Sequence, residues 1–273
     1  MSRRLLFVAC ACVAFGAALA PAAADGPPQG VAQDGVGILS PDRSIRYLTW
    51  TNRSQTVLEA VRTRGGTVVN EVLLRGGLSI PAVAWTPTGI SADGRTLVLA
   101  SYPWSRGPAT FLLLSVPDFE TQQVVTLRGR WAFDAISPRA RVLYLIQSLA
   151  TDGATRYRVR AYDLPQHRLV ERTIADRREP GAMTGSPVTR AVSHGGRWAY
   201  TLYARADGTA FVHALDTVRL AAVCVDLPAR GWSDAWNVRM WVSRDGKALH
   251  LRNAGNGGGA AVVDTLTWRA RTN

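Results

Sequence analysis

The stretch SADGRTLVLASY, residues 91–102, contains the pattern that decides the fold. A serine and an Asp-Gly pair precede an apolar run of the kind that forms β-strands. Related stretches occur four more times: SPDRSIRYLTW from Ser40, SPRARVLYLIQS from Ser137, SHGGRWAYTLYA from Ser193 and SRDGKALHLRN from Ser243. We call these five residues the landmark serines. Their spacings of 51, 46, 56 and 50 residues are typical of propellers and solenoids.

Each repeat contains four β-rich runs with turn residues between them. In the second repeat, PAVAWTPTGIS leads into the turn, and TLVLASY, ATFLLLSV and QQVVTLRG follow it. No long stretch has apolar residues at a helical period. The Asp-Gly pair predicts a hairpin between the first two strands of a repeat, because Gly accepts a positive φ and the Ser or Asp side chain can cap the N–H groups of the turn.

The strand after the Ser91 turn is apolar on both faces. Leu97 and Leu99 point to one side, whereas Val98 and Ala100 point to the other. A blade of a propeller has a neighbour on each face and supplies this cover. We therefore predict an all-β fold, a β-propeller of about five four-stranded antiparallel blades over residues 36–273, with six blades possible. An open or oligomer-completed ring is an alternative, because no strand from one terminus visibly completes a blade at the other.

The phrase resembles the WD40-like and YVTN-type repeats of bacterial secreted β-propellers. The matching residues are Ser40-Pro41-Asp42, Ser91-Ala92-Asp93-Gly94-Arg95 and Ser243-Arg244-Asp245-Gly246-Lys247, with later steps at Tyr162-Asp163-Leu164, Leu215-Asp216-Thr217 and Val263-Asp264-Thr265. The resemblance covers nearly the whole chain after residue 35 and implies a fold rather than an activity. The Ser137 repeat lacks Asp-Gly and the Ser193 repeat lacks the Asp, so we expect looser or different turns there.

The N-terminus has the pattern of a secretory signal peptide. Arg3 and Arg4 precede the apolar run from Leu5 to Ala20, and Ala22-Ala23-Ala24 offers a small-residue cleavage site. We expect residues 1–24 to be removed, residues 25–35 to form a short linker, and the protein to be secreted. An uncleaved anchor is the alternative, and we expect no transmembrane segment in the mature chain.

Composition and cysteine content narrow the range of partners. The net charge is +12, or +10 without Arg3 and Arg4. Codon bias explains the many arginines, and attraction to anionic envelope polymers or lipid headgroups is the functional alternative. Nucleic acid is not an expected partner. Cys224 is the one cysteine after the leader. It therefore has no internal disulfide, and we expect it to be a buried small hydrophobe.

The sequence contains no recognisable catalytic motif. The four histidines, at positions 167, 194, 213 and 250, lack metal-ligand spacing, so we predict no metal and no cofactor. The glycine-rich stretch 255–260 precedes a strand rather than a helix, which favours a hairpin loop over a dinucleotide site. Enzymatic activity is uncertain. The alternative is a lactonase-type hydrolase with dispersed channel residues, for which the innermost strands offer Trp85, Asp134, Arg190, Arg239 and Trp241.

Two groups of residues are candidates for ligand binding. Arg156, Arg158 and Arg160 alternate with apolar residues, so their guanidinium groups share one strand face and could grip phosphate or carboxylate groups. A solvated edge is the other interpretation. Trp232 and Trp236 could stack on sugar rings or anchor a partner, or could form a wedge between the last two blades. We expect a secreted binding or scaffold module of the bacterial cell envelope, with a protein or an anionic or saccharide polymer as its partner.

Overall fold

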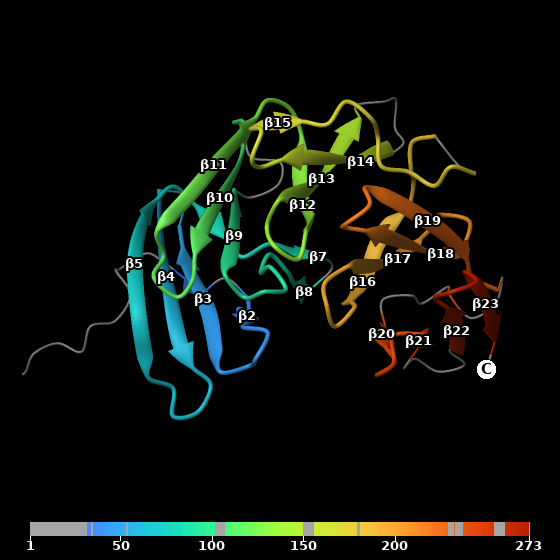
Figure 1. Ribbon diagram of the computed structural model, residues 1–273, viewed down its shortest axis with the longest axis horizontal. Helices are drawn as coiled ribbons and strands as arrows, with labels where there is room; N and C mark the ends of the chain where they lie inside the picture. The colour runs from blue at the N-terminus through green and yellow to red at the C-terminus, as the bar shows by residue number, and fades with distance from the viewer. Residues whose placement is uncertain are drawn as a thin grey trace, which may run out of the picture.

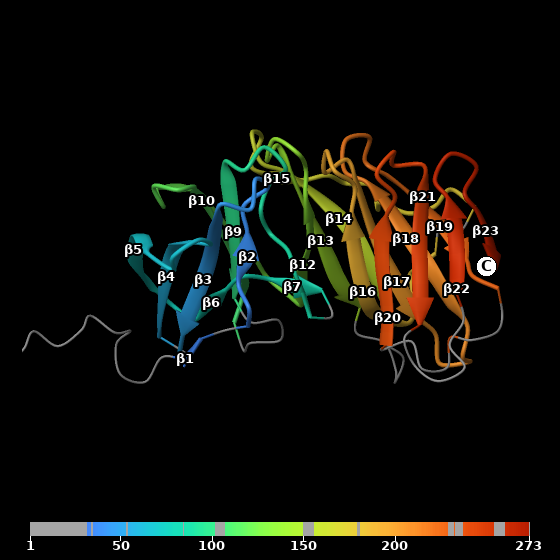
Figure 2. The same ribbon diagram turned by 90° about the horizontal axis from the view of Figure 1, so that it is seen from below.

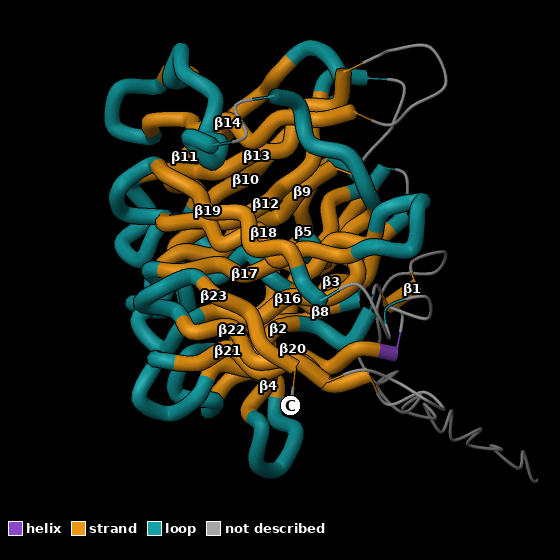
Figure 3. Tube along the Cα trace, turned by 90° about the vertical axis from the view of Figure 1, so that its right-hand side faces the viewer, coloured by secondary structure: helices purple, strands orange, loops and turns teal. Residues whose placement is uncertain are grey.

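The computed structural model describes residues 32–33, 35–52, 54–83, 85–101, 107–149, 156–178, 181–228, 232, 237–253 and 260–272. They form an all-β propeller whose sheets are antiparallel and follow one another along an arc in chain order (Figure 1, Figure 2). The first strands of the blades face the centre of the arc and the last strands lie at its periphery. Figure 3 shows the stacked strands from the side, with loops at both rims. The predicted fold class is confirmed.

Five blades make up the arc. Blade 1 contains β1 (Ala32–Gln33), β2 (Ile38–Leu39), β3 (Ile45–Thr51), β4 (Gln55–Arg62) and β5 (Val68–Arg75). Blade 2 contains β6 (Leu78–Ser79), β9 (Thr96–Ser101), β10 (Ala109–Ser115) and β11 (Thr121–Leu127). Blade 3 contains β12 (Trp131–Ile136), β13 (Val142–Leu149), β14 (Arg156–Asp163) and β15 (Arg168–Leu169). Blade 4 contains β16 (Ser186–Val192), β17 (Trp198–Ala204), β18 (Ala210–Asp216) and β19 (Ala221–Asp226). Blade 5 contains β20 (Val238–Val242), β21 (Ala248–Asn253), β22 (Ala260–Asp264) and β23 (Arg269–Thr272).

The innermost strand of blade 2 differs from the sequence prediction. The segment from Pro81 to Pro87, expected to be that strand, forms a separate two-stranded hairpin of β7 (Ala82–Val83) and β8 (Thr86–Pro87). The short β6 pairs with β9 instead. Two prolines without N–H groups weaken a central ladder position, and Trp85 turns the chain with a φ of 67°.

The landmark serines all make the same hydrogen bonds. In each repeat the serine Oγ accepts from the N–H group five residues later, at 2.9 to 3.0 Å. The serine carbonyl accepts from the N–H group three residues later, at 2.8 to 2.9 Å. Where an aspartate follows, the serine Oγ donates to its Oδ1 at 2.5 to 2.6 Å. The serine therefore recurs because it closes the turn, as the capping argument predicted.

The prediction of looser or different turns at Ser137 and Ser193 is wrong. The residue three positions after each landmark serine has a positive φ whether or not it is glycine: Arg43, Gly94, Ala140, Gly196 and Gly246. Ala140 and Arg43 occupy the left-handed region at 49° and 61° and make the same N–H bond to the serine carbonyl, at 2.9 and 2.8 Å. The hydrogen bonds of the serine hold the turn even where the residue type disfavours it.

One rule describes how the blades stack. Residues six and eight positions after a landmark serine, such as Leu97 and Leu99, face the preceding blade, and we call this side the leading face. Residues seven and nine positions after it, such as Val98 and Ala100, face the following blade, on the trailing face. Four interfaces between successive blades are each filled by buried apolar side chains in this way. The two-sided apolar strand predicted from sequence is thus confirmed.

The described residues form an open arc and not a closed ring. Among the described residues, no buried apolar cluster joins blade 5 to blade 1, and Figure 1 shows the two blades at the two ends of the arc. The alternative of an open arrangement is the one observed. Blade 1 therefore ends the arc with its leading face, and blade 5 ends it with its trailing face.

Candidate functional site

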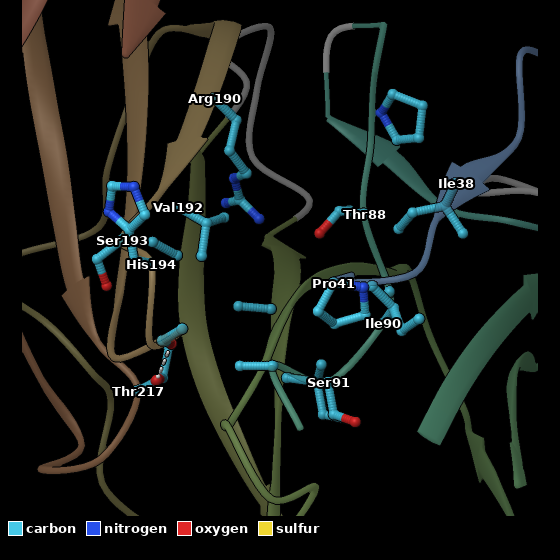
Figure 4. A pocket seen from close by; sticks show the side chains of 17 residues that line it. Ile38, Pro41, Thr88, Ile90, Ser91, Arg190, Val192, Ser193, His194 and Thr217 are labelled. Atoms are coloured by element: carbon cyan, nitrogen blue, oxygen red, sulfur yellow. Dashed lines mark hydrogen bonds between the residues drawn. The ribbon is translucent and has the colours of Figure 1, made fainter. Parts of the chain in front are cut away.

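A cavity of about 200 Å³ lies at the centre of the arc, where the first four blades meet (Figure 4). Most of its lining is apolar, and Arg190 and His194 are its titratable side chains. The lining residues labelled in Figure 4 are Ile38, Pro41, Thr88, Ile90, Ser91, Arg190, Val192, Ser193, His194 and Thr217. Pockets that enclose drug-sized ligands usually exceed this volume, whereas a single side chain of a partner fits it.

The landmark turns come together beside this cavity. A Cβ built on Gly196 would lie 2.5 Å from the Cβ of Ala92, and one built on Gly94 would lie 3.2 Å from Pro41. The N–H group of Asp93 donates to the carbonyl of Pro138 at 3.1 Å. Turns from blades 1 to 4 are thus in mutual contact around the axis, which makes this end of the centre rigid.

The hydroxyl groups of Ser91, Ser193 and Thr217 at the cavity are engaged in structural hydrogen bonds. Ser91 Oγ accepts from the N–H of Thr96 and donates to Asp93, and Ser193 Oγ accepts from the N–H of Trp198. Thr217 Oγ1 lies 2.9 Å from the carbonyl oxygens of both Gly196 and Arg197. These hydroxyls hold turns together, and none is positioned as a nucleophile beside a base.

Two of the predicted channel residues form a buried ion pair between blades 3 and 4. Asp134 sits at a β-bulge of β12, which leaves it outside the ladder with β13. Arg190 on β16 donates to the carboxylate and the main-chain carbonyl of Asp134, and to Thr201 Oγ1 at 2.7 Å. The side chains of Arg190 and Asp134 are 2% and 1% exposed. The pair joins two blades, so the charge of Arg190 is neutralised inside the protein.

The other three predicted channel residues face solvent. Trp85 is 90% exposed at the turn of the β7–β8 hairpin, which lies near β16 at the centre of the arc (Figure 1). Trp241 on β20 is 47% exposed and stacks on His250 with ring centroids 5.3 Å apart. Arg239 precedes it on the same face of β20 and is exposed. The centre of the molecule therefore combines a buried ion pair with exposed aromatic rings.

A second cavity, of about 240 Å³, lies between blades 3 and 4. Cys224, Met183, Arg205 and Phe211 are among its lining residues. Cys224 is half-buried, and its Sγ lies 3.7 Å from Nδ1 of His213 across the β18–β19 pair. The expectation of a buried small hydrophobe is therefore wrong in part. The sequence does not reveal the contact with His213, because the two residues are 11 positions apart and meet only through strand pairing.

Burial sets the protonation state of His213, and hydrogen bonds set that of Asp176. His213 is 1% exposed, and burial lowers its pKa to about 4, so the imidazole is neutral at physiological pH. Burial also acts to raise the pKa of Asp176, but hydrogen bonds from Arg178 and from the N–H of Cys224 outweigh it and lower that pKa to about 2. The carboxylate of Asp176 thus fixes the backbone beside Cys224, at 2.8 Å from its N–H.

The predicted arginine group lies on β14 of blade 3. Arg156 and Arg158 are exposed, and Tyr157 and Val159 between them are buried, so the alternation along the strand is as expected. Arg160 is half-buried and donates to Gln147 and to the carbonyl of Val170. The guanidinium groups of Arg156 and Arg158 are therefore accessible for binding, whereas that of Arg160 is engaged in hydrogen bonds within blade 3.

The predicted tryptophan pair is only partly described. Trp232 is 3% exposed, packs in the cluster between blades 4 and 5, and donates from Nε1 to the carbonyl of Pro228 at 2.7 Å. This position favours the wedge over the stacking platform, because a buried ring offers no face to a ligand. Trp236 and the stretch 255–259 lie outside the described residues.

The structure also shows where potential metal ligands and two of the histidines lie. Within the described residues, no group of three potential metal ligands comes together, and no helix is long and apolar enough to cross a membrane. His194 lines the central cavity, whereas His167 is exposed and lies 2.9 Å from Gln123 through its Nδ1.

No protein-family model matches the sequence, and no curated protein matches it. Solved structures do resemble the fold. Hydrazine synthase of Kuenenia stuttgartiensis superposes with a TM-score of 0.53 at 15% identity, over 90% of this chain and 69% of that one. A functionally unknown protein from Desulfotomaculum acetoxidans DSM 771 gives 0.52 at 13% identity, over 89% and 68%. A structure of prolyl endopeptidases gives 0.52 at 12%, over 86% and 34%. Identities this low show a shared fold alone.

Proposed function

We propose that this propeller is a non-catalytic binding or scaffold module of the bacterial cell envelope, exported by its leader, and that it binds a protein at the centre of the arc. The observation that carries the proposal is the position of Trp85. A tryptophan ring that is 90% exposed on a hairpin turn does not gain the free energy of burial unless a partner covers it.

Other exposed side chains on the innermost strands support a protein ligand. Tryptophan and arginine are the residues most enriched at the centre of protein interfaces, and Trp241 and Arg239 are exposed on the innermost strand of blade 5. The central cavity, at about 200 Å³, has the size for one inserted side chain. The hydroxyl groups of Ser91, Ser193 and Thr217 there are occupied by turn bonds, which favours binding over the alternative of lactonase-type hydrolysis.

The experiment immobilises the purified protein and measures retention of partners from a detergent-solubilised envelope extract. The Trp85→Ala variant is compared with Leu266→Ala, which truncates a 72% exposed apolar side chain on the β22–β23 turn. The proposal predicts that a protein retained by the original chain and by Leu266→Ala is lost with Trp85→Ala. Equal retention by all three would contradict binding at the centre.

The exposed arginines favour a second candidate ligand, an anionic envelope polymer. Arg156 and Arg158 present two guanidinium groups on one strand face, in the spacing that suits repeated phosphate or carboxylate groups. Co-sedimentation with purified cell-wall polymer tests this. Replacing Arg156, Arg158 and Arg160 together by alanine abolishes binding if these arginines form the site. Unchanged sedimentation would show that they do not bind the polymer.

A further inference from the structure

A row of polar side chains crosses the leading face of blade 4, from the centre of the arc to its periphery. Its members are successive partners across the ladders of β16, β17, β18 and β19: Arg190, Thr201, His213 and Cys224. The inner half of the row has a structural explanation, because Arg190 donates to Thr201 and to Asp134 of blade 3. The outer half, His213 and Cys224, has no such explanation.

His213 makes weaker polar contacts than its burial requires. It is 1% exposed and lies within β18, every residue of which is buried. Its Nδ1 lies 3.7 Å from Sγ of Cys224, and its Nε2 has no hydrogen-bond partner among the described residues. A thiol is a weak donor and a weak acceptor, and buried imidazole nitrogens normally have strong partners. An apolar side chain would be less costly here, so a ligand of the imidazole would explain the histidine.

The separation of the sulfur and the nitrogen fits a metal ion bound between them. An ion bonded to sulfur at about 2.3 Å and to nitrogen at about 2.0 Å, with an angle of about 120°, holds the two atoms roughly 3.7 Å apart. Nδ1 of His213 and Sγ of Cys224 lie at this distance. The two side chains therefore need little movement to bind one ion.

A thioether group lines the same cavity as the thiol. Met183 and Cys224 both line the cavity of about 240 Å³ between blades 3 and 4. Both also pack against one buried aromatic cluster, which consists of Tyr157, Tyr203 and Phe211. The backbone of Met183 is fixed by hydrogen bonds of 2.9 and 3.1 Å with Tyr157, whereas its unbranched side chain is flexible. Met183 can thus supply a third donor from the cavity.

This set of donors selects the kind of metal. Thiolate and thioether sulfur favour Cu(I), and imidazole binds copper as well, whereas Mg²⁺ and Ca²⁺ prefer oxygen ligands. Among the described residues no third thiol, imidazole or carboxylate completes a group with Cys224 and His213, as a closed structural zinc site would require.

The charged side chains beside the cavity do not oppose a cation. Arg178 forms an ion pair with Asp176 at 2.7 Å, and Arg205 forms one with Asp226 at 2.9 Å. The positive charge of each arginine is therefore balanced by a carboxylate. A Cu(I) ion bound to a thiolate adds no net charge to this partly buried place.

We propose that Cys224, His213 and Met183 form a binding site for a single Cu(I) ion at the outer end of the interface between blades 3 and 4. The ion replaces the proton of the thiol, which passes to solvent, and no electron is transferred. The proposal does not depend on what the centre of the arc binds. It departs from the sequence-based prediction of no metal, because strand pairing rather than sequence spacing brings the donors together.

Titration of the purified protein with Cu(I) against a chromophoric Cu(I) chelator, in the absence of oxygen, tests the site. Cys10 and Cys12 are replaced by serine, so that Cys224 is the one thiol of the chain. We expect about one equivalent to bind, with sulfur and nitrogen ligands at roughly 2.0 to 2.3 Å in X-ray absorption spectra. Cys224→Ser abolishes binding, and His213→Gln and Met183→Leu each weaken it by at least about tenfold.

Met240→Leu and His167→Gln are the matched controls, because they change the same residue types elsewhere and leave the affinity unchanged. Circular dichroism confirms that each variant is folded, and His213→Asn replaces His213→Gln if that variant is not. A thiol that binds Cu(I) without help would keep its affinity in both His213→Gln and Met183→Leu, which overturns the proposal. Binding that survives Cys224→Ser, or the absence of stoichiometric binding, overturns it as well.

Discussion

Arg190 of blade 4 donates hydrogen bonds to both the carboxylate and the main-chain carbonyl of Asp134 in blade 3. The contact links the innermost strands of two blades at the wall of the central cavity. A bulge in β12 makes it possible, because it takes Asp134 out of the ladder. Arg190, which the sequence offers as a candidate channel residue of a hydrolase, thus has a structural role and holds two blades together.

Arg190→Met is expected to destabilise the protein by about 3–5 kcal/mol, because it leaves the carboxylate of Asp134 buried without its counter-charge. Urea denaturation measures the change. Arg205→Met, in the partly exposed pair with Asp226, is the control and costs less than about 1 kcal/mol. Equal effects of the two substitutions would contradict the structural role of Arg190.

Ser137→Ala is expected to destabilise the protein by about 1–3 kcal/mol, because Ser137 Oγ accepts from the N–H groups of both Arg141 and Val142. Ser137→Thr keeps the oxygen and is expected to restore most of the loss. Thermal unfolding of the three proteins distinguishes them. A landmark serine that can be removed without effect would leave the recurrence of the motif unexplained.

Ala140→Gly is expected to stabilise the protein by about 1 kcal/mol. Ala140 has a φ of 49°, a conformation that disfavours a residue with a Cβ and suits glycine. The reverse change at the equivalent position, Gly246→Ala, is expected to destabilise by a similar amount, because a Cβ there would meet no other atom within 4 Å. Chemical denaturation measures both changes, and a destabilising Ala140→Gly would show that the turns are not equivalent.

Stability is expected to fall as the pH is lowered from about 7 to 4. His213 has a pKa of about 4 when folded and 6.5 as its ordinary value, so the unfolded chain binds a proton in this range that the folded chain does not. The loss reaches at most roughly 3 kcal/mol. Denaturation midpoints across this range measure it. His213→Gln flattens the profile, whereas the exposed His167→Gln does not, and an unchanged slope in His213→Gln would contradict the assignment.

The architecture was largely predictable because it is encoded locally and repeatedly. Each landmark serine closes its own turn. In the strand that follows, alternate residues face the preceding and the following blade, so the sequence predicts which side chains pack against which blade. Features that depend on contacts between blades were not visible. The Asp134–Arg190 pair spans 56 residues and needs a bulge, and the Cys224–His213 contact depends on the register of β18 and β19. The hairpin around Trp85 escaped prediction because its sequence reads equally well as a strand.

The sequence also named candidate ligand residues without their environment. Trp232 is buried between two blades, and Arg160 donates a hydrogen bond to Gln147. The sequence alone reveals neither the burial nor the hydrogen bond. By contrast, the exposure of Trp85 appears only once the strand pairing is known.

The most direct measurement is photo-crosslinking from the centre of the arc. A photoreactive amino acid replaces Thr86, next to Trp85, or Leu266 as a control, and the purified protein is irradiated in a detergent-solubilised envelope extract. Binding at the centre predicts that an envelope protein is crosslinked from position 86 and not from position 266. The same products from both positions, or no product from position 86, would contradict it.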